Sequence, residues 1–307
     1  MRYVKVVAPA TLSNVGPGFD LLGFALDEPE DIMIIQKNSS LTLKIINHSD
    51  SHIPEDPLEN VATIAAGAML KALGINEGFD FIFERKINPG SGIGSSAASC
   101  TAAVMGVNEL LNKPFSKPEL LNFALVGECA ASGSIHADNV APALFGGFIL
   151  IRSYSPMDII SIKFPADLFC TVIHPNIEIK TSESRKLIPN RFPIHTVLEQ
   201  CGNIAALISG LGSSDFELIG RALEDAIAEP IRANMIPGYN EIKANARKNG
   251  ALGANISGSG PSIFALSNTL ENAQKVGSYM VNTFENLGIK NDLYISGVNK
   301  NGTRIVE

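Results

Sequence analysis

Residues 88–99 read NPGSGIGSSAAS, and this glycine-rich stretch decides which fold the chain is expected to adopt. Glycines alternate at positions 90, 92 and 94, and two serines then lead into an alanine-rich segment that predicts a helix over residues 96–111. Because glycine has no Cβ atom, such a loop can turn tightly and point several backbone N–H groups inward. The first turn of the following helix adds unpaired N–H groups and the positive end of the helix dipole. The stretch therefore predicts a binding loop for a polyanion such as a nucleotide phosphate.

Two common phosphate-binding patterns do not fit this loop. A Walker loop requires Lys and then Ser or Thr after its last glycine, whereas Gly94 is followed by Ser95. The dinucleotide fingerprint requires two residues between its second and third glycines, whereas Ile93 alone separates Gly92 from Gly94. A glycine-rich turn that binds no ligand is the alternative for the loop taken alone. The spacing otherwise predicts a phosphate loop of a third kind.

Two further motif-like segments lie near the ends of the chain. Residues 6–27 read VVAPATLSNVGPGFDLLGFALD, and residues 250–266 read GALGANISGSGPSIFAL. Between them lie the blocks HADNVAPALFGG at 136–147, TSESRKLIP at 181–189 and EPIRANMIPG at 229–238. With the glycine loop, in this order and spacing, the end segments resemble the three motifs of the GHMP kinases, a superfamily of small-molecule kinases.

Within this superfamily the chain is most similar to the homoserine kinases. Their N-terminal pattern occurs here as Pro9, Ala10, Thr11, Asn14, Gly16, Pro17, Gly18, Phe19 and Asp20. The resemblance covers nearly the whole chain. It implies an ATP-dependent phosphotransferase that phosphorylates the side-chain hydroxyl of L-homoserine in threonine biosynthesis. A mevalonate-like or sugar-like kinase of the superfamily is the alternative, followed by a non-catalytic ligand sensor on the same scaffold.

The resemblance also implies an α+β fold of two domains. An N-terminal domain with a ribosomal-protein-S5-like fold, residues 1–153, would carry the ATP loop, and a ferredoxin-like C-terminal domain would span residues 154–307. The chain pattern agrees with an α+β class, because helical and strand-like segments are mixed without strict alternation. The last residues, 292–307, predict a hairpin about the turn Asn301-Gly302.

Composition is that of an ordinary globular protein. Of 307 residues, 45% are hydrophobic and 18% are charged. No apolar run has the length of a membrane span, and no secretory h-region is present, so no membrane partner is expected. The net charge of −7 argues against nucleic-acid binding, which requires a basic face. The cysteines (Cys100, Cys129, Cys170 and Cys201) form no CxxC pair, so we expect buried free thiols in a cytoplasmic protein.

The matched motifs imply a site for ATP and Mg²⁺. Mg²⁺ prefers hard oxygen ligands and takes few of them from protein, and Ser96 and Glu128 match the ligand positions of the family. Taken alone, Glu128 reads as a solvated helix carboxylate. Asn60 matches an adenine-contacting position, and taken alone it reads as a helix N-cap. The full set expected to bind the nucleotide is Asn60, Pro89, Gly90, Ser91, Gly92, Ile93, Gly94, Ser95, Ser96, Ala97 and Ser259.

A zwitterionic acceptor requires an anionic or amide partner for its ammonium group and a guanidinium fork for its carboxylate. Arg185 and Arg232 fall in the matching blocks and are expected to bind the carboxylate. Asn14 and Asp20 are expected at the amino and hydroxyl end, and His136 beside them. In most proteins each of these residues would be a surface residue or a turn former.

The catalytic candidates are Asn14 and three residues of the HADN block, His136, Asp138 and Asn139. An aspartate base in this region, as in mevalonate kinases, is one possibility. The homoserine kinase resemblance instead implies no dedicated base, so that the hydroxyl attacks in line while metal, loop and helix dipole stabilise the charge. The third motif, residues 258–261, predicts a second tight loop that packs against the first. The family also implies a homodimer.

Overall fold

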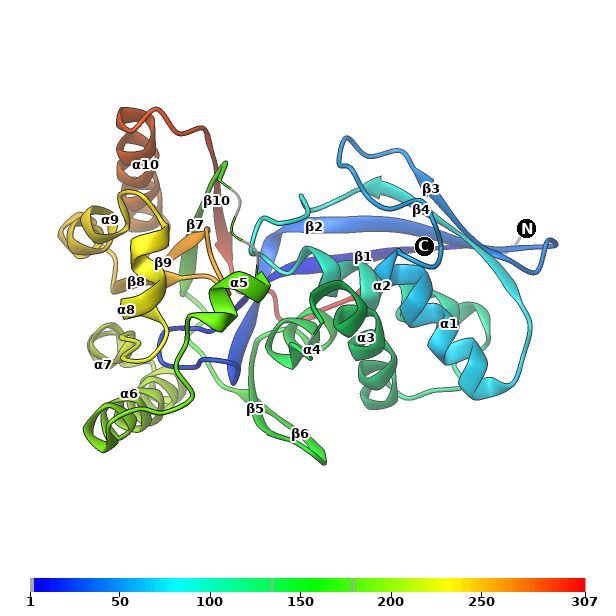
Figure 1. Cartoon of the computed structure of the whole chain (residues 1–307), viewed down its shortest axis with the longest axis horizontal. Coiled ribbons are helices and arrows are strands. Elements are labelled where there is room, and N and C mark those ends of the chain that lie inside the picture. Colours follow the sequence, from blue (N-terminus) through cyan, green and yellow to red (C-terminus); the bar gives the residue numbers. More distant parts are fainter. Residues whose placement is uncertain (1–2, 134, 178, 180, 307) are drawn as a thin grey trace.

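The computed structural model describes residues 3–133, 135–177, 179 and 181–306, and these residues form two β-sheets with helices packed on them (Figure 1). The seven-stranded sheet has the order β11-β1-β2-β4-β3, with β5 and then β6 attached to β2, and the four-stranded sheet has the order β10-β7-β9-β8. The strands are β1 (Tyr3–Ser13), β2 (Leu22–Asn38), β3 (Leu43–Asn47), β4 (Gly78–Arg85), β5 (Phe148–Tyr154), β6 (Met157–Ile162), β7 (Phe169–Pro175), β8 (Gly253–Ile256), β9 (Ile263–Ser267), β10 (Asn291–Gly297) and β11 (Arg304–Ile305). The helices are α1 (Val61–Leu73), α2 (Ser95–Leu110), α3 (Lys117–Ser132), α4 (Ala137–Phe145), α5 (Thr181–Lys186), α6 (Ile194–Ser213), α7 (Phe216–Ala222), α8 (Glu229–Arg232), α9 (Tyr239–Ala246) and α10 (Leu270–Asn286), with short 3₁₀ turns at Ala233–Met235 and Arg247–Asn249.

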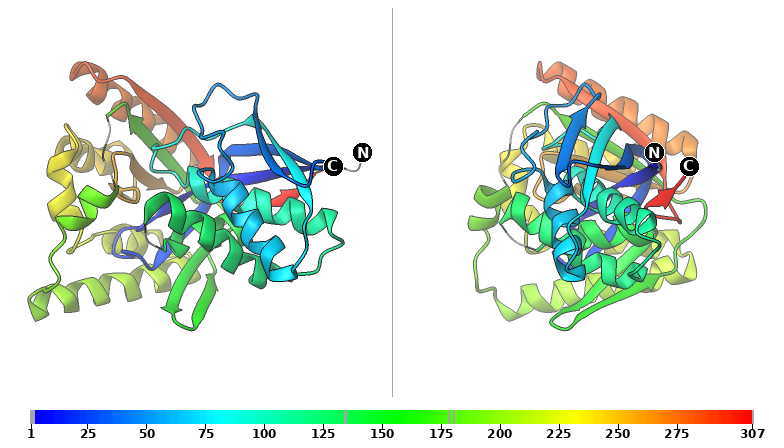
Figure 2. Two further views of the ribbon diagram at one scale, coloured as in Figure 1. Left: turned by 45° about the vertical axis from the view of Figure 1, so that its right-hand side comes forward. Right: turned by 90° about the vertical axis from the view of Figure 1, so that its right-hand side faces the viewer.

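Helices α1 to α4 gather on one face of the first sheet, as Figures 1 and 2 show. Helix α2 lies in the middle of this layer and contacts α1, α3, α4 and the first two strands. Small side chains allow the close packing, since Ala97, Ala98 and Ala102 are fully buried. At Gly106 a Cβ atom would lie 2.2 Å from Cδ1 of Ile35 on β2. The helix that carries the predicted phosphate loop is therefore held rigidly against the sheet.

The second sheet is covered on one face by α9 and α10 (Figure 1). Its hydrophobic core joins Ile242 of α9 and Met280 of α10 to Ile263 of β9. The other face of the sheet packs against the first half of the chain, where the rings of Phe264 and Phe24 lie 6.5 Å apart in an edge-on contact. This apolar packing joins the two sheets.

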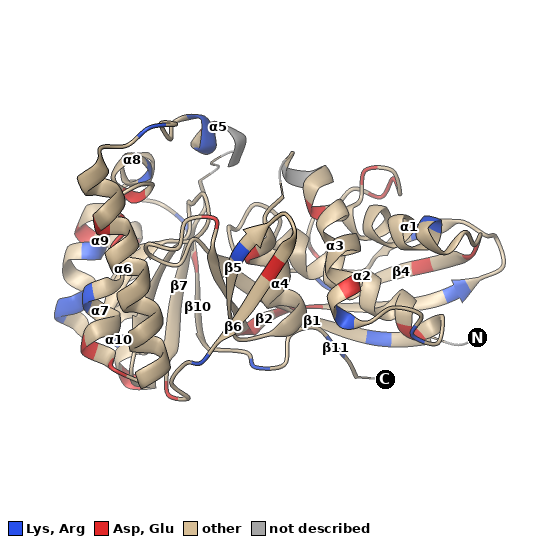
Figure 3. Cartoon of the chain, turned by 90° about the horizontal axis from the view of Figure 1, so that it is seen from below, with Lys and Arg blue, Asp and Glu red and all other residues tan. Residues whose placement is uncertain are grey.

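The predicted α+β class is confirmed by these elements. Strands β6 and β11 follow residue 153 in the chain but belong to the first sheet, and the division of the chain at residue 153 stays a prediction. Of the helices in the described part, none has both the length and the apolar character of a membrane span. Lysine and arginine residues are interspersed with aspartate and glutamate residues along both halves of the chain (Figure 3).

The predicted C-terminal hairpin is wrong. Strand β10 pairs antiparallel with β7, from Asn291 opposite Pro175 to Gly297 opposite Phe169. The chain then returns to the first sheet, where Ile305 lies opposite Val6. The Asn301-Gly302 turn exists, but Asn299 Oδ1 accepts hydrogen bonds from the backbone N–H groups of both turn residues and directs the chain across the molecule.

The cysteines are all free, as predicted, but not all are buried. Cys100 and Cys170 lie in the hydrophobic core, and burial raises the pKa of both thiols well above the ordinary value. Cys129 is half-buried. Cys201 is exposed, so the expectation of a buried thiol is wrong for this residue, which lies on an outward side of α6.

Candidate active site

A cavity of about 700 Å³ lies at the junction of the two halves of the chain and contacts all three predicted motifs. Of the predicted site residues, it is lined by Asn14, Asp20, Asn60, Pro89, Gly90, Gly92, Gly94, Ser95, Ser96, Glu128, His136, Asn139, Arg185, Arg232 and Ser259. Ser91, Ile93, Ala97 and Asp138 do not line it; these four are buried behind its wall. A second hollow of about 840 Å³, between residues 50–52 and 285–292, shares Pro89 with the first but none of the other predicted residues.

The glycine loop requires its glycines. Gly90, Gly92 and Gly94 have φ values of 79°, 71° and 70°, in the left-handed region that other residues avoid. Gly94 is the N-cap residue of α2 and no side chain caps this helix end. The first turn of α2 therefore presents its backbone N–H groups at the wall of the cavity, which is the arrangement that binds phosphate.

The third motif packs against this loop, as predicted. Ser257 Oγ donates a hydrogen bond to the carbonyl oxygen of Gly92 at 2.6 Å, and the Ser262 hydroxyl donates to the carbonyl oxygen of Ser91. His174 Nδ1 lies 3.1 Å from Ser262 Oγ. These contacts hold the phosphate loop from the side of the second sheet.

The N-terminal motif holds the same loop from the other side. The backbone N–H of Thr11 donates to the carbonyl oxygen of Ile93 at 3.0 Å. Thr11 Oγ1 donates to Asn139 Oδ1 at 2.9 Å, and Asn139 Nδ2 donates to Ser13 Oγ at 2.9 Å. Both ends of the Asn139 amide are thereby fixed, and the side chain is held at the edge of the cavity.

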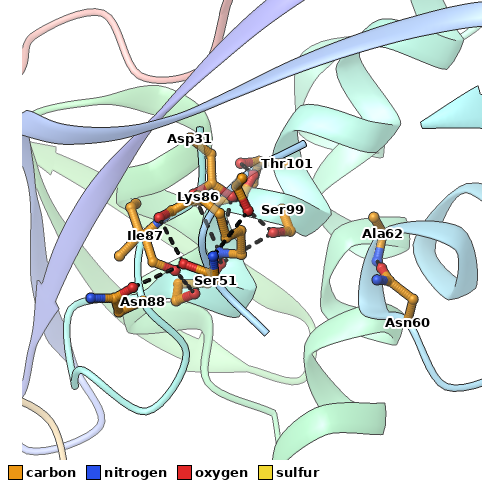
Figure 4. A network of polar contacts seen from close by, with 12 residues as sticks. Asp31, Ser51, Asn60, Ala62, Lys86, Ile87, Asn88, Ser99 and Thr101 are labelled. Carbon is orange, nitrogen blue, oxygen red and sulfur yellow. Dashed lines mark hydrogen bonds and ion pairs between the residues drawn. The ribbon is translucent and has the colours of Figure 1, made fainter. Parts of the chain in front are cut away.

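A buried ion pair supports the first turn of α2 (Figure 4). Lys86 Nζ lies 3.1 Å from Asp31 Oδ2, and their side chains are 4% and 0% exposed. The Lys86 ammonium also donates to the carbonyl oxygen of Ser95 at 2.9 Å, and Ser99 Oγ donates to Asp31 Oδ2 at 2.8 Å. Burial raises the pKa of Asp31 and lowers that of Lys86, and their mutual attraction opposes both shifts. The sequence did not predict this pair, although Lys86 lies two positions before the glycine-rich stretch.

Ser96 and Glu128, the predicted metal ligands, lie next to each other. The Ser96 side chain hydrogen bonds to the Glu128 carboxylate, which is 4% exposed. Burial raises the pKa of Glu128, and the nearby Lys86 charge opposes the rise. The described residues contain no group of three or more His, Cys, Asp and Glu side chains that could hold a metal ion. One hydroxyl and one carboxylate fit Mg²⁺, which takes its remaining ligands from phosphate and water.

Asn60 caps α1, as its position alone predicted. Its Oδ1 accepts from the backbone N–H of Ala62 at 3.0 Å, and its Nδ2 donates to the carbonyl oxygen of Pro54 at 2.7 Å. The residue also lines the cavity, together with Pro54, Ile53 and Val61. Ile53, Pro54 and Val61 therefore give the cavity an apolar wall beside Asn60.

Charged residues gather at the opposite end of the cavity. Arg185 binds Asp20 through two parallel contacts, Nη1 to Oδ1 at 2.8 Å and Nη2 to Oδ2 at 2.6 Å. Asn14 Oδ1 accepts from the backbone N–H of Asp20 at 2.7 Å. The carbonyl oxygen of Gly258 accepts from Asn14 Nδ2 at 2.9 Å and from Arg232 Nη1 at 2.8 Å. The structure thus brings together four residues that the sequence spreads over more than two hundred positions.

The HADN block begins helix α4, which was not predicted. His136 occupies the N-cap position and lines the cavity, and burial lowers the pKa of its imidazole while the Asp20 carboxylate opposes this. Asp138 is 1% exposed and lies behind the wall. Burial, reinforced by the negative charge of Asp20, raises the pKa of Asp138 to about 7.

Residues 60–147 match the model of the GHMP kinases N terminal domain, and residues 203–286 match that of the GHMP kinases C terminal domain. The chain belongs to the GHMP kinase family, so it is an ATP-dependent kinase that acts on a hydroxyl group. A homoserine kinase of Chlorobium phaeobacteroides (strain BS1) is 44% identical over the full length of both chains. The crystal structure of homoserine kinase from Cytophaga hutchinsonii has a TM-score of 0.95 and 43% identity, and the match covers 100% of this chain and 98% of that one.

Mevalonate kinases share the fold alone. The structure of the L. major enzyme in complex with R-mevalonate has a TM-score of 0.73 at 18% identity, over 96% of each chain. The predicted two-domain GHMP kinase fold is therefore confirmed. The two homoserine kinases named above are 43–44% identical to this chain, against 18% for this mevalonate kinase.

Proposed function

We propose that this chain is a homoserine kinase, which transfers the γ-phosphoryl group of ATP to the side-chain hydroxyl of L-homoserine and forms O-phospho-L-homoserine. The full-length relatives at 43–44% identity bear out this prediction and its place in threonine biosynthesis. One observation in the structure supports this proposed function most directly. A single cavity has the glycine loop at one end and, at the other, the Asp20 carboxylate paired with Arg185 and the buried Arg232.

We assign the acceptor end by charge. Asp20 would bind the ammonium group of homoserine, and Arg185 and Arg232 would bind its carboxylate, because a guanidinium fork matches a carboxylate in geometry. Asn14 and His136 would contact the substrate beside them. In the structure Arg185 and Asp20 neutralise each other, so a zwitterion that inserts between them replaces one ion pair by two.

We assign the nucleotide end by backbone geometry. The loop from Pro89 to Ala97 would hold the triphosphate through its backbone N–H groups, with Ser259 closing it from the third motif. Asn60 would contact the adenine. Ser96 and Glu128 would hold Mg²⁺, which when bound offsets the charge on the transferred phosphate. A homodimer and a cytoplasmic location stay predictions of the family resemblance and the free cysteines.

Arg232→Ala tests the acceptor assignment. The substitution should raise the KM for L-homoserine by about 10- to 100-fold, since it removes a charge-assisted hydrogen bond to the carboxylate. The KM for ATP should stay unchanged. Steady-state release of ADP with ATP and Mg²⁺ measures both constants, and Arg221→Ala is the matched control, because that side chain is 67% exposed on α7. An unchanged homoserine KM would refute the assignment, and turnover of mevalonate or galactose in preference to homoserine would refute the proposed function.

Asp138→Asn tests whether a side chain acts as general base. Because Asp138 is 1% exposed and accepts a hydrogen bond from the backbone N–H of Asn14, we propose direct in-line attack without a dedicated base, and the amide should cost far less in kcat than the roughly 100- to 10,000-fold that a base contributes. An Asp138 base would lose activity as pH falls, because it becomes protonated below its pKa of about 7. The pH profile of kcat therefore checks the proposal. A thousandfold loss, or an inflection near pH 7 that the variant abolishes, would contradict it.

A further inference from the structure

Phe19, between the GPG turn and Asp20, lies against both arginines of the acceptor end. The ring centroid is 5.3 Å from Cζ of Arg185 and 5.2 Å from Cζ of Arg232. Both distances are within the range of a cation–π contact. Two guanidinium groups on one ring join α5 and α8, which are far apart in the sequence, to the N-terminal motif.

The two arginines differ in what else they contact. Arg185 is half-exposed and forms the double contact with Asp20. Arg232 is 3% exposed and donates one hydrogen bond to the carbonyl oxygen of Gly258. Among the described residues its Nε atom has no hydrogen-bond partner, and no carboxylate lies within ion-pair distance. The buried charge of Arg232 is therefore held near the cavity by the Gly258 carbonyl and by the face of Phe19.

An aromatic ring suits this position better than a carboxylate. The negative face of the ring attracts a cation without accepting its N–H groups, so the contact with Phe19 uses none of the donors of either arginine. A carboxylate at the same place would accept the donors of Arg232 and compete with the substrate. The ring also offsets the repulsion between the two arginines, and the nearby Arg185 charge contributes to lowering the pKa of Arg232 after burial.

We propose that Phe19 is a positioning residue for substrate recognition. Its ring holds the guanidinium groups of Arg185 and Arg232 at the acceptor end without using their N–H donors, and it thereby makes the site selective for an acceptor that carries a carboxylate. This inference rests on the proposed function for the identity of that acceptor. The position of the two arginines does not depend on it.

A kinetic comparison tests the selectivity. Phe19→Leu keeps an apolar side chain but removes the ring, and it should raise the KM for L-homoserine about tenfold through the loss of two cation–π contacts, with kcat and the KM for ATP unchanged. The value of kcat/KM for 3-amino-1-propanol, which is homoserine without its carboxylate, should change less than about twofold by the same reasoning. Phe19→Tyr should restore the homoserine KM. An unchanged homoserine KM, or an equal loss with both acceptors, would overturn the proposal.

Phe145→Leu is the matched control. Its ring also carries a cation, Lys117 Nζ at 5.7 Å from the centroid, but it lies outside the cavity. The same substitution there should leave the homoserine KM unchanged. If it raised the KM as much as Phe19→Leu does, a general loss of packing would explain both results and the proposal would fall.

A spectroscopic measurement separates this inference from the proposed function. In the free protein, the ring current of Phe19 should shift the side-chain N–H resonances of Arg185 and Arg232, and Phe19→Leu should move both while Phe145→Leu moves neither. If these resonances had the same chemical shifts in Phe19→Leu as in the unsubstituted protein, the positioning role would be refuted, whichever acceptor the enzyme uses. Moving resonances in a protein that does not phosphorylate homoserine would support the positioning role and reject the proposed function alone.

Discussion

Replacing Lys86 by methionine should lower the free energy of unfolding by about 3–5 kcal/mol. The Asp31 carboxylate is fully buried, and methionine would leave it without its counter-charge. Asp31 would keep the hydrogen bonds from Ser99 Oγ at 2.8 Å and from the backbone N–H of Ile87 at 2.7 Å, which do not replace a cation. Denaturant unfolding of the two proteins measures the difference.

Lys37→Met is the control for this prediction. It is the same substitution in a pair of similar length, Lys37 Nζ to Glu77 Oε1 at 2.8 Å, but the side chains are 41% and 32% exposed. Water already screens this pair, so its loss should cost about 0–1 kcal/mol. A second variant, Asp31→Asn with Lys86→Met, removes both charges and should recover part of the stability. Equal losses for Lys86→Met and Lys37→Met would show that burial does not decide the strength of the pair.

The glycine loop could be predicted because its requirement is local. Three alternating glycines can adopt left-handed φ values that other residues avoid, and each of them does so. The pair of Asp31 and Lys86 could not be predicted, because each residue lies in or beside an apolar strand and they meet only when β2 and β4 pair. Local chemistry is visible in a sequence, whereas a buried ion pair depends on the register of two strands.

The HADN block illustrates a different limit. No helix is predicted there from the sequence, and His136, Asp138 and Asn139 are grouped as catalytic candidates. In the structure His136 precedes helix α4 as its N-cap residue and, like Asn139, lines the cavity, whereas Asp138 is 1% exposed and accepts a hydrogen bond from the backbone N–H of Asn14. The position at which the helix begins therefore decides which of the three side chains reach the cavity, and the sequence does not show where it begins.

The prediction of a C-terminal hairpin was wrong for a third reason. An Asn-Gly dipeptide predicts a turn but does not say which strands flank it. Here Gly302 packs against α4, where a Cβ atom would lie 2.4 Å from the carbonyl oxygen of Leu144. The turn is therefore fixed by a contact distant in sequence, and the strands before and after it belong to different sheets.

Gly94→Ala should lower kcat/KM for ATP by about 100-fold or more. The new Cβ atom would lie 1.9 Å from Thr11 Oγ1, whereas real contacts of this kind do not fall below 3.0 Å, so the loop or the buried Thr11 side chain must move by about 1 Å. A displacement of about this size at a reacting group costs about 100-fold in rate. Moving Gly94 would also tilt the first turn of α2, which we propose binds the triphosphate through its backbone N–H groups. Steady-state kinetics at saturating homoserine measure the loss.

Gly90→Ala is the control for this contact, because both glycines lie in the same loop with left-handed φ values but only Gly94 lies against Thr11. Gly90 lies in the same loop with a φ of 79°, and no atom lies within 4 Å of its Cβ position. Both alanines carry the strain of a left-handed residue, about 1–2 kcal/mol, which the loop can relieve by leaving its present conformation, so Gly90→Ala should cost about tenfold in kcat/KM at most. The further loss in kcat/KM for Gly94→Ala, beyond that for Gly90→Ala, then measures the effect of the contact between Thr11 and the glycine loop. If the two variants lost the same activity, backbone strain alone would account for both, and Thr11 would not position the loop.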